Sequence, residues 1–272
     1  MTREVITLSV GQCGNQLAHD FWLRLAEMLG INMAGCAPEL TTEGSQFGRN
    51  VRYDVCFNEV EEGRFVARSV LLDLEPRIVN SILHGPQGAL HSTKNAWVGS
   101  DGGGAGNLWT NGYAQGRLYA DVIQEKVRAE LEKADCAEAV NLLHSINGGT
   151  GSGLGSALLE FLRDAFPKKI LQTYSVLPDC DASSSVVVQP YNAMLTFDRL
   201  THCADAVHPI QNARLDAICT DTYQLAQPSV STQNSIIADA VTALLAPLLF
   251  PSFANSSLAS VLSSLVPLPK LH

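Results

Sequence analysis

Short apolar runs alternate with longer amphipathic stretches along most of the 272-residue chain. The apolar runs are rich in β-branched side chains and predict buried strands at Glu4 to Val10, Phe65 to Leu72, Glu138 to Ser145, Ile170 to Val176 and, more weakly, Ala204 to Pro209. The stretches between them have the helical period and predict helices. Because parallel strands need such crossover helices, the alternation predicts a doubly wound α/β fold, with a mostly parallel sheet and helices on both faces.

The predicted helices set the domain organisation. They cover about 11–29, 109–133, 152–166, 186–202, 212–220 and 231–246. The last is apolar on most faces, so we expect it at the centre of a domain that spans 1–246. Pro247 would end or kink this helix about one turn early, and 247–272 is expected to form a loop and a short helix. Residues 30–64 are predicted as loop and a short hairpin, and 179–185 as a polar loop.

The stretch from Leu142 to Gly155 joins an apolar run, a glycine-rich turn and a helix start, in that order. Such a junction leaves backbone N–H groups unpaired and pointing the same way, which favours an anion. Five glycines stand within 148–155, and Thr150 and Ser152 add hydroxyl donors or a helix cap. The alternative is a tight turn without a ligand. A Walker loop would need a Lys after the glycines, and the dinucleotide fingerprint lacks its third glycine, so the turn fits a phosphate loop of another kind.

Three further segments place polar chemistry at predicted strand ends. Gln12 and Gln16 share one face of the first helix, where they either donate to phosphate oxygens or are solvated. Asp73 and Glu75 close a strand, either as ligands of a hard cation or as a helix cap and a surface charge. The glycine-rich segment 102–106 is either a bare backbone for a ligand or a flexible surface loop. Because the carboxyl ends of parallel strands share one edge, we expect these segments to meet there.

Composition and charge narrow the functional class. With 46% hydrophobic and 17% charged residues, the chain fits one large domain or two small ones. A net charge of -9 without clustered Lys or Arg argues against a nucleic-acid partner. Seven cysteines without metal-like spacing favour a reducing compartment, and the most apolar segment, 236–250, is too short and mixed to span a bilayer. We therefore expect a cytosolic protein that binds neither nucleic acid nor membrane.

Seven stretches of the chain resemble tubulins and their bacterial FtsZ relatives, most closely the gamma-tubulins. They are REVITLSVGQCGNQ, LLDLEPR, GGGAGN, GGTGSGLGS, PKKILQTYSVLP, VVVQPYN and LVPLPKLH. Among them GGGAGN, TYSVLP and VVVQPYN favour the gamma-tubulins over other tubulins. The resemblance extends along the whole chain and covers only the amino-terminal nucleotide-binding domain of a tubulin. It implies GTP or GDP with Mg²⁺ as ligands.

The resemblance also assigns roles to residues of this chain. Residues expected to contact the nucleotide are Gln12, Cys13, Gln16, Asn107, Ser145, Gly148, Gly149, Thr150, Gly151, Asn212 and Asn234. Within this set, Asn107 would meet the γ-phosphate, and Asn212 and Asn234 would read the guanine edge, since a carboxamide both donates and accepts. Residues expected to position Mg²⁺ are Asp73 and Glu75.

Several positions depart from the family pattern. Asn147 replaces a Gly or Ala at the head of the glycine turn, Leu108 replaces an Asn, and Ser185 replaces an Asp that faces the ribose. Val230 replaces the aromatic ring that stacks on the base, a loss of about 1 kcal/mol, roughly tenfold in affinity. Tubulins complete hydrolysis in a neighbour's pocket with acidic residues after the central helix. Residues 255–260 carry serines there instead, so we expect at most a weak GTPase.

The resemblance leads to two hypotheses of different classes. The first is a GTP-binding, gamma-tubulin-like cytoskeletal protein of microtubule nucleation, with α/β-tubulin and gamma-tubulin complex proteins as partners in the cytoplasm, at the cytoskeleton and the microtubule-organising centre. The second is a degenerate tubulin domain that acts as an interaction module with weak or no nucleotide binding. A dinucleotide enzyme has little support because its fingerprint fails. The sequence stops where a tubulin enters its intermediate domain, so we expect exposed apolar helix faces around 248–265.

Overall fold

A parallel sheet forms the centre of the molecule. The computed structural model describes residues 3–37, 51–100, 102–177, 186–225, 228–250 and 257–268. Within these residues, six strands pair in the order β5-β4-β1-β6-β7-β8, and every pairing is parallel. The strands are β1 (Glu4–Val10), β4 (Ser69–Asp73), β5 (Ala96–Val98), β6 (Ala137–Ser145), β7 (Ile170–Leu177) and β8 (Ala206–Gln211). The predicted doubly wound α/β fold is confirmed.

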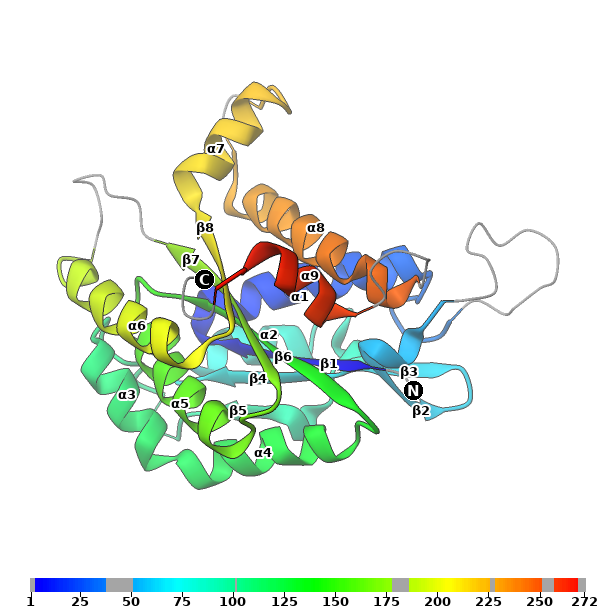
Figure 1. The fold of residues 1–272 in the computed structure, drawn as a ribbon, viewed down its shortest axis with the longest axis horizontal. Coiled ribbons are helices and arrows are strands. Elements are labelled where there is room, and N and C mark those ends of the chain that lie inside the picture. Colours follow the sequence, from blue (N-terminus) through cyan, green and yellow to red (C-terminus); the bar gives the residue numbers. More distant parts are fainter. Residues whose placement is uncertain are drawn as a thin grey trace.

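Helices cover both faces of this sheet (Figure 1). One face carries α1 (Gly11–Leu29), α8 (Val230–Leu249) and α9 (Leu258–Leu265). The other carries α3 (Trp109–Leu118), α4 (Ala120–Glu132), α5 (Gly155–Ala165) and α6 (Gln189–Cys203). Two further helices, α2 (Pro76–Leu83) and α7 (Asn212–Asp221), follow β4 and β8. A separate hairpin pairs β2 (Phe57–Glu61) with β3 (Arg64–Ala67).

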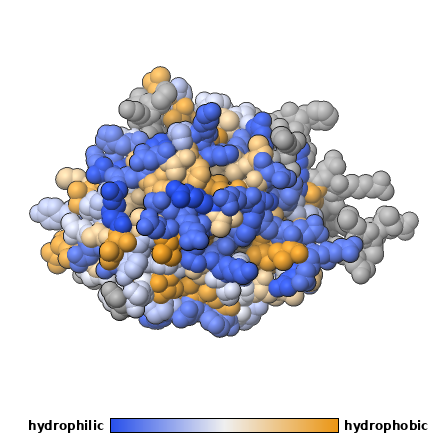
Figure 2. All heavy atoms as spheres, turned by 90° about the horizontal axis from the view of Figure 1, so that it is seen from below, coloured by the Kyte–Doolittle hydropathy of each residue, from blue (hydrophilic) through white to orange (hydrophobic). Residues whose placement is uncertain are grey.

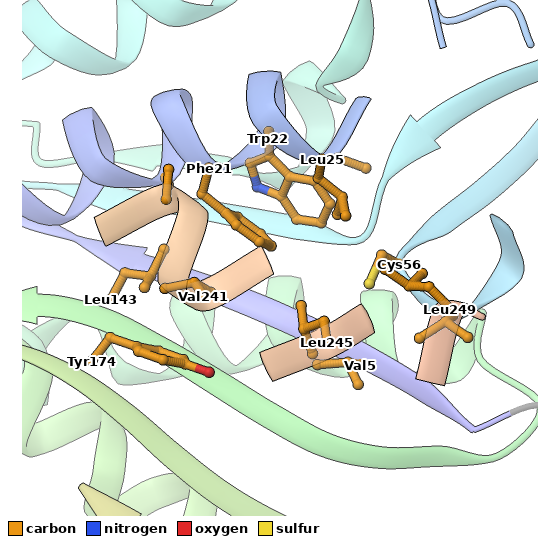
Figure 3. Close-up of a cluster of buried hydrophobic side chains, with 14 of the residues drawn as sticks. Val5, Phe21, Trp22, Leu25, Cys56, Leu143, Tyr174, Val241, Leu245 and Leu249 are labelled. Carbon is orange, nitrogen blue, oxygen red and sulfur yellow. The ribbon is translucent and has the colours of Figure 1, made fainter. Parts of the chain in front are cut away.

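Alternation along the strands fills a core on each face. In β1, Val5 belongs to the core under α1 and α8, whereas Ile6 and Leu8 belong to the core under α4 and α5. Figure 3 shows the first of these cores, where Phe21 of α1 lies beside Val241 of α8, and Leu245 of α8 lies beside Val5 of β1. Burial of each such side chain contributes about 1.5–3 kcal/mol. This packing fixes α1 and α8 on the sheet, and both helices contribute residues to the cavity described below.

The outer surface of the α4 side mixes hydrophilic and apolar side chains (Figure 2). This agrees with the amphipathic pattern of the helices, whose apolar faces lie on the sheet. Among the described residues, no helix combines the length and apolar character needed to cross a bilayer.

Two predicted elements are divided in the structure. The apolar run from Phe65 to Leu72 is not one strand, because β3 pairs antiparallel with β2 while β4 pairs parallel with β1, and Arg68 lies between them. The predicted helix over 109–133 is likewise two helices. They are separated at Tyr119, whose ring packs on Trp97 with centroids 5.3 Å apart and whose hydroxyl hydrogen-bonds Ser100 at 2.8 Å.

The carboxyl-terminal part differs from the prediction. Pro247 does not end the helix, because α8 continues to Leu249 and the buried side chains of Leu248 and Leu249 hold its last turn in the core. The exposed apolar faces expected around 248–265 are mostly covered among the described residues, because α9 packs Leu258 and Leu262 against this core, although Leu265 is exposed. Residues 251–256 and the predicted polar loop 179–185 lie outside the described residues.

Candidate functional site

The carboxyl ends of the parallel strands bring the predicted loops together at one edge of the sheet. Gly11 follows β1 with a φ of +75°, which favours glycine, and a Cβ built on it would lie 3.0 Å from the amide nitrogen of Gly151. The first loop therefore lies directly on the glycine turn after β6. Behind it, Gln12 is exposed, whereas Cys13 and Gln16 are half-buried. Burial raises the pKa of the Cys13 thiol to about 11, so it stays a neutral thiol at neutral pH.

Asp73 is a buried carboxylate at the end of β4. Its Oδ1 accepts a hydrogen bond from the Glu75 amide at 3.3 Å, and its Oδ2 has no partner in the described part of the chain. Burial raises the pKa of Asp73 to about 6. Glu75 is exposed and immediately precedes α2, which begins at Pro76. An unpaired buried carboxylate oxygen is a strong reason to expect a cation there.

The carboxylate pair fits Mg²⁺ held jointly with a ligand rather than a protein-only metal site. The described residues contain no group of three His, Cys, Asp or Glu side chains that could hold a metal ion. Mg²⁺ keeps several waters and commonly takes one or two carboxylates together with phosphate oxygens. Asp73 and Glu75 thus supply the one or two carboxylate ligands that Mg²⁺ takes from a protein when phosphate oxygens and waters complete its coordination.

The loop 102–108 contacts both neighbouring parts of the site. A Cβ on Gly104 would overlap the carboxylate of Glu75, and Asn107 Oδ1 lies 3.7 Å from the position of a Cβ on Gly148. Asn107 has a φ of +58°, in the left-handed region, where a non-glycine residue is strained. Such strain in a loop between a carboxylate pair and a glycine turn is typical of a functional site.

The glycines after β6 have two different tasks. A Cβ on Gly149 would lie 2.6 Å from the Leu108 nitrogen, and one on Gly151 would lie 2.6 Å from the Ser145 carbonyl oxygen. A Cβ on Gly153 would overlap the Trp109 carbonyl oxygen. These three glycines are needed for close packing. Gly148 differs, because a Cβ there would meet no described atom nearer than Asn107 Oδ1, at 3.7 Å. The open backbone that a phosphate needs is therefore at Gly148.

A π-helical turn over Thr150–Leu154 connects this loop to α5. Such turns are often found at functional sites. The hydroxyl of Ser152 is fully buried and donates to the Gly148 carbonyl oxygen, so it holds the loop and does not face a ligand. Thr150 is only half-buried.

Three buried residues that the sequence did not single out hold these loops. Asn15 accepts a hydrogen bond from Ser9 Oγ at 2.6 Å and donates to the Leu72 carbonyl oxygen at 3.0 Å, which joins β1 to the end of β4. His144 bonds the Gly151 carbonyl oxygen, and Asn192 bonds both glycine-containing loops. For Asn15 the sequence does contain a signal, because it is a polar residue on the otherwise apolar, buried face of α1.

A cavity of about 310 Å³ lies between α1, α2 and α8. It brings together Gln16, predicted to contact the nucleotide from the first loop, and Asn234, predicted to read the guanine edge. Val230, predicted to replace the stacking ring, lines the same cavity. Asn234 also hydrogen-bonds Asp20. The remaining lining residues are His19, Asp20, Ile78, Ser81, Ile82 and Ser231. Asn212 begins α7 at the end of β8 and is not among them, and Ser185 lies outside the described residues.

Comparison with known families agrees with this geometry. The profile of the Tubulin/FtsZ family, GTPase domain, matches residues 4–220. The chain belongs to the tubulin/FtsZ family. The sheet and its surrounding helices are those of this family's GTPase domain, and the chain is a GTP-binding member of a cytoskeletal family. The matched residues include the glycine turn, the Asp73 and Glu75 pair, the 102–108 loop and the beginning of α7.

Proposed function

We propose that this tubulin/FtsZ member binds GTP with Mg²⁺ at the carboxyl edge of its sheet and acts as a gamma-tubulin-type protein in microtubule nucleation. The single observation that carries the proposal is the continuous series of contacts that links the loops after β1, β4 and β6 and the loop before α3. Gly11 lies on Gly151, Gly104 lies on Glu75, and Asn107 lies beside Gly148. A nucleoside triphosphate with its bound cation is a ligand that can contact all four loops at once.

The phosphates would lie against the open backbone at Gly148, with Ser145, Gly149, Thr150 and Gly151 around them and Asn107 at the terminal phosphate. Asp73 and Glu75 would hold Mg²⁺, which supplies positive charge against the phosphate oxygens. The Oδ2 of Asp73, which has no hydrogen-bond partner among the described residues, supports this assignment. Gln12 and Cys13 would contact the nucleotide from the first loop.

The base would enter the cavity beside Gln16 and Asn234, with Asn212 reading its edge from the start of α7. Val230 offers less stacking surface than an aromatic ring, so we propose an affinity below that of tubulins with the ring. The sequence over 255–260 has no carboxylate for a neighbour's nucleotide, which supports a weak GTPase at most.

The gamma-tubulin assignment rests on the stretches GGGAGN, TYSVLP and VVVQPYN. With it we propose α/β-tubulin and gamma-tubulin complex proteins as partners, and the cytoplasm, the cytoskeleton and the microtubule-organising centre as the location. An acidic chain without a basic cluster supports a protein partner over a nucleic acid.

Titration with GTP in the presence and absence of Mg²⁺ tests the nucleotide part of the proposal. Asp73→Ala should weaken the magnesium-dependent binding at least tenfold, or about 1.4 kcal/mol, whereas Asp121→Ala, an exposed position in α4, should not. Equal affinity of both variants would contradict the metal assignment. The nucleating role is tested by the lag before α/β-tubulin assembles, which the wild-type protein should shorten. A protein that binds tubulin but not GTP would favour the interaction module instead.

A further inference from the structure

One side chain on α6 makes three hydrogen bonds to the loops of the candidate site. Asn192 Oδ1 accepts from the backbone amide of Trp109 at 2.9 Å. Its Nδ2 donates to the carbonyl oxygen of Asn107 at 2.7 Å and to that of Asn147 at 3.0 Å. Asn192 is 2% exposed. Both N–H groups of its amide are therefore used within the protein.

The three bonded groups belong to different parts of the site. Asn107 ends the loop 102–107, Trp109 is the first residue of α3, and Asn147 precedes the open Gly148. The residue before α3, Leu108, provides no side-chain cap, so Asn192 supplies an acceptor to the start of this helix from 83 residues away. One side chain thus sets the distance between the two loops.

The bond to Asn107 falls on the strained residue of the site. With φ at +58°, Asn107 is in the left-handed region, which is uncommon for any residue other than glycine and which bonds from the surrounding structure help to maintain. Its carbonyl oxygen receives the shortest of the three Asn192 bonds. Releasing this carbonyl would let the loop 102–107 relax away from Gly148.

We infer that Asn192 is a positioning residue for phosphate binding: it joins the two glycine-containing loops in the spacing that a chain of phosphates requires, without being a ligand contact itself. The inference rests on the proposed binding of GTP. Loops already fixed in the bound arrangement cost less to order when the ligand arrives, so loss of this link appears as lost affinity for the phosphates. The base, held by α1 and α8, is unaffected by it.

The opposing view is that Asn192 only anchors α6, since Thr196 and Leu200 on the following turns of its face are also buried. Comparison of GTP with guanosine separates the two views, because guanosine lacks the phosphates. In Asn192→Ala we expect GTP affinity to fall at least about tenfold, with guanosine affinity within about twofold of wild type. Met194→Ala, at a 70% exposed position of the same helix, is the matched control and should change neither.

Asn192→Asp provides a second variant of the same size. It keeps an acceptor for the Trp109 amide but loses the donor, and it sets a carboxylate oxygen against two carbonyl oxygens. It should therefore lose GTP affinity as well. An equal loss of GTP and guanosine, or no loss of either, would overturn the inference.

Amide hydrogen exchange without nucleotide makes the test independent of the proposed function. In Asn192→Asp, exchange should rise in both 102–109 and 146–149 and stay unchanged in β1. A rise confined to α6 would overturn the inference. If wild-type protein binds no GTP, the proposed function fails, and the exchange measurement alone still decides whether Asn192 joins the loops.

Discussion

His144 Nδ1 lies 3.0 Å from the carbonyl oxygen of Gly151, and its Nε2 lies 2.8 Å from Ser175 Oγ. Because a carbonyl oxygen only accepts, the proton is on Nδ1, and Nε2 accepts from the serine hydroxyl. The neutral ring thus satisfies both bonds under the glycine turn. Burial lowers the pKa of His144 from 6.5 to about 4.

This pKa shift predicts a loss of stability in acid. Between pH 6.5 and 4 the unfolded chain binds a proton at His144 that the folded chain does not, so the free energy of unfolding falls as the pH falls through this range. The full effect of this one residue is about 3 kcal/mol below pH 4. Denaturant titrations from pH 7 to 4 should show a shallower fall for His144→Gln than for wild type. His84→Gln, at an exposed position with no ion pair among the described residues, should follow wild type, and parallel curves for all three would contradict the assignment.

Adding a methyl group should have different effects at a glycine needed for packing and at the open Gly148. Gly153→Ala forces a Cβ onto the Trp109 backbone and should cost about 1–3 kcal/mol of unfolding free energy. Gly148→Ala meets no close backbone, so its stability should stay within about 0.5 kcal/mol of wild type. Its affinity for GTP should nevertheless fall, because the added group enters the space assigned to a phosphate. Unchanged GTP affinity in Gly148→Ala would contradict the placement of the phosphates at Gly148.

Restoring a ring at the base cavity should strengthen nucleotide binding. Val230 begins α8, is 66% exposed and lines the cavity with Gln16 and Asn234. Val230→Tyr should raise GTP affinity roughly tenfold through stacking on the base. Val60→Tyr, at a 60% exposed position in the β2–β3 hairpin, is the control and should bind as wild type does. If Val230→Tyr does not raise the GTP affinity, the base does not lie beside Val230.

Glu130 connects the hairpin to the sheet and is predicted to stabilise the fold. This fully buried carboxylate accepts from Asn58 Nδ2 and Asn95 Nδ2, both at 2.6 Å, and from Lys133 Nζ at 2.7 Å. Glu130→Ala leaves these donors without their acceptor and should lower the unfolding free energy by roughly 3 kcal/mol. Glu132→Ala, exposed two positions along the same helix, should stay within about 0.5 kcal/mol of wild type in the same denaturant titration.

Local pattern predicted most strands and the loops between them because each is encoded in a few adjacent residues, but it missed the three-residue strand β5. The strand at Glu4 to Val10 and the turn after Ser145 lie where the sequence placed them. The pattern did not separate β3 from β4, because an apolar run does not reveal which strand it pairs with. Asn192 carried no local signal either, since its bonds reach 45 to 85 residues along the chain. Such side chains are recognised only once the loops they join are placed.

Equilibrium dialysis of the purified protein against guanine nucleotide measures directly whether the loops at the carboxyl edge of the sheet hold a nucleotide. The site built from Gly11, Asp73, Asn107 and Gly148 predicts saturable binding of a single GTP per chain that weakens when Mg²⁺ is removed. Protein that stays empty at millimolar GTP with Mg²⁺ would contradict it.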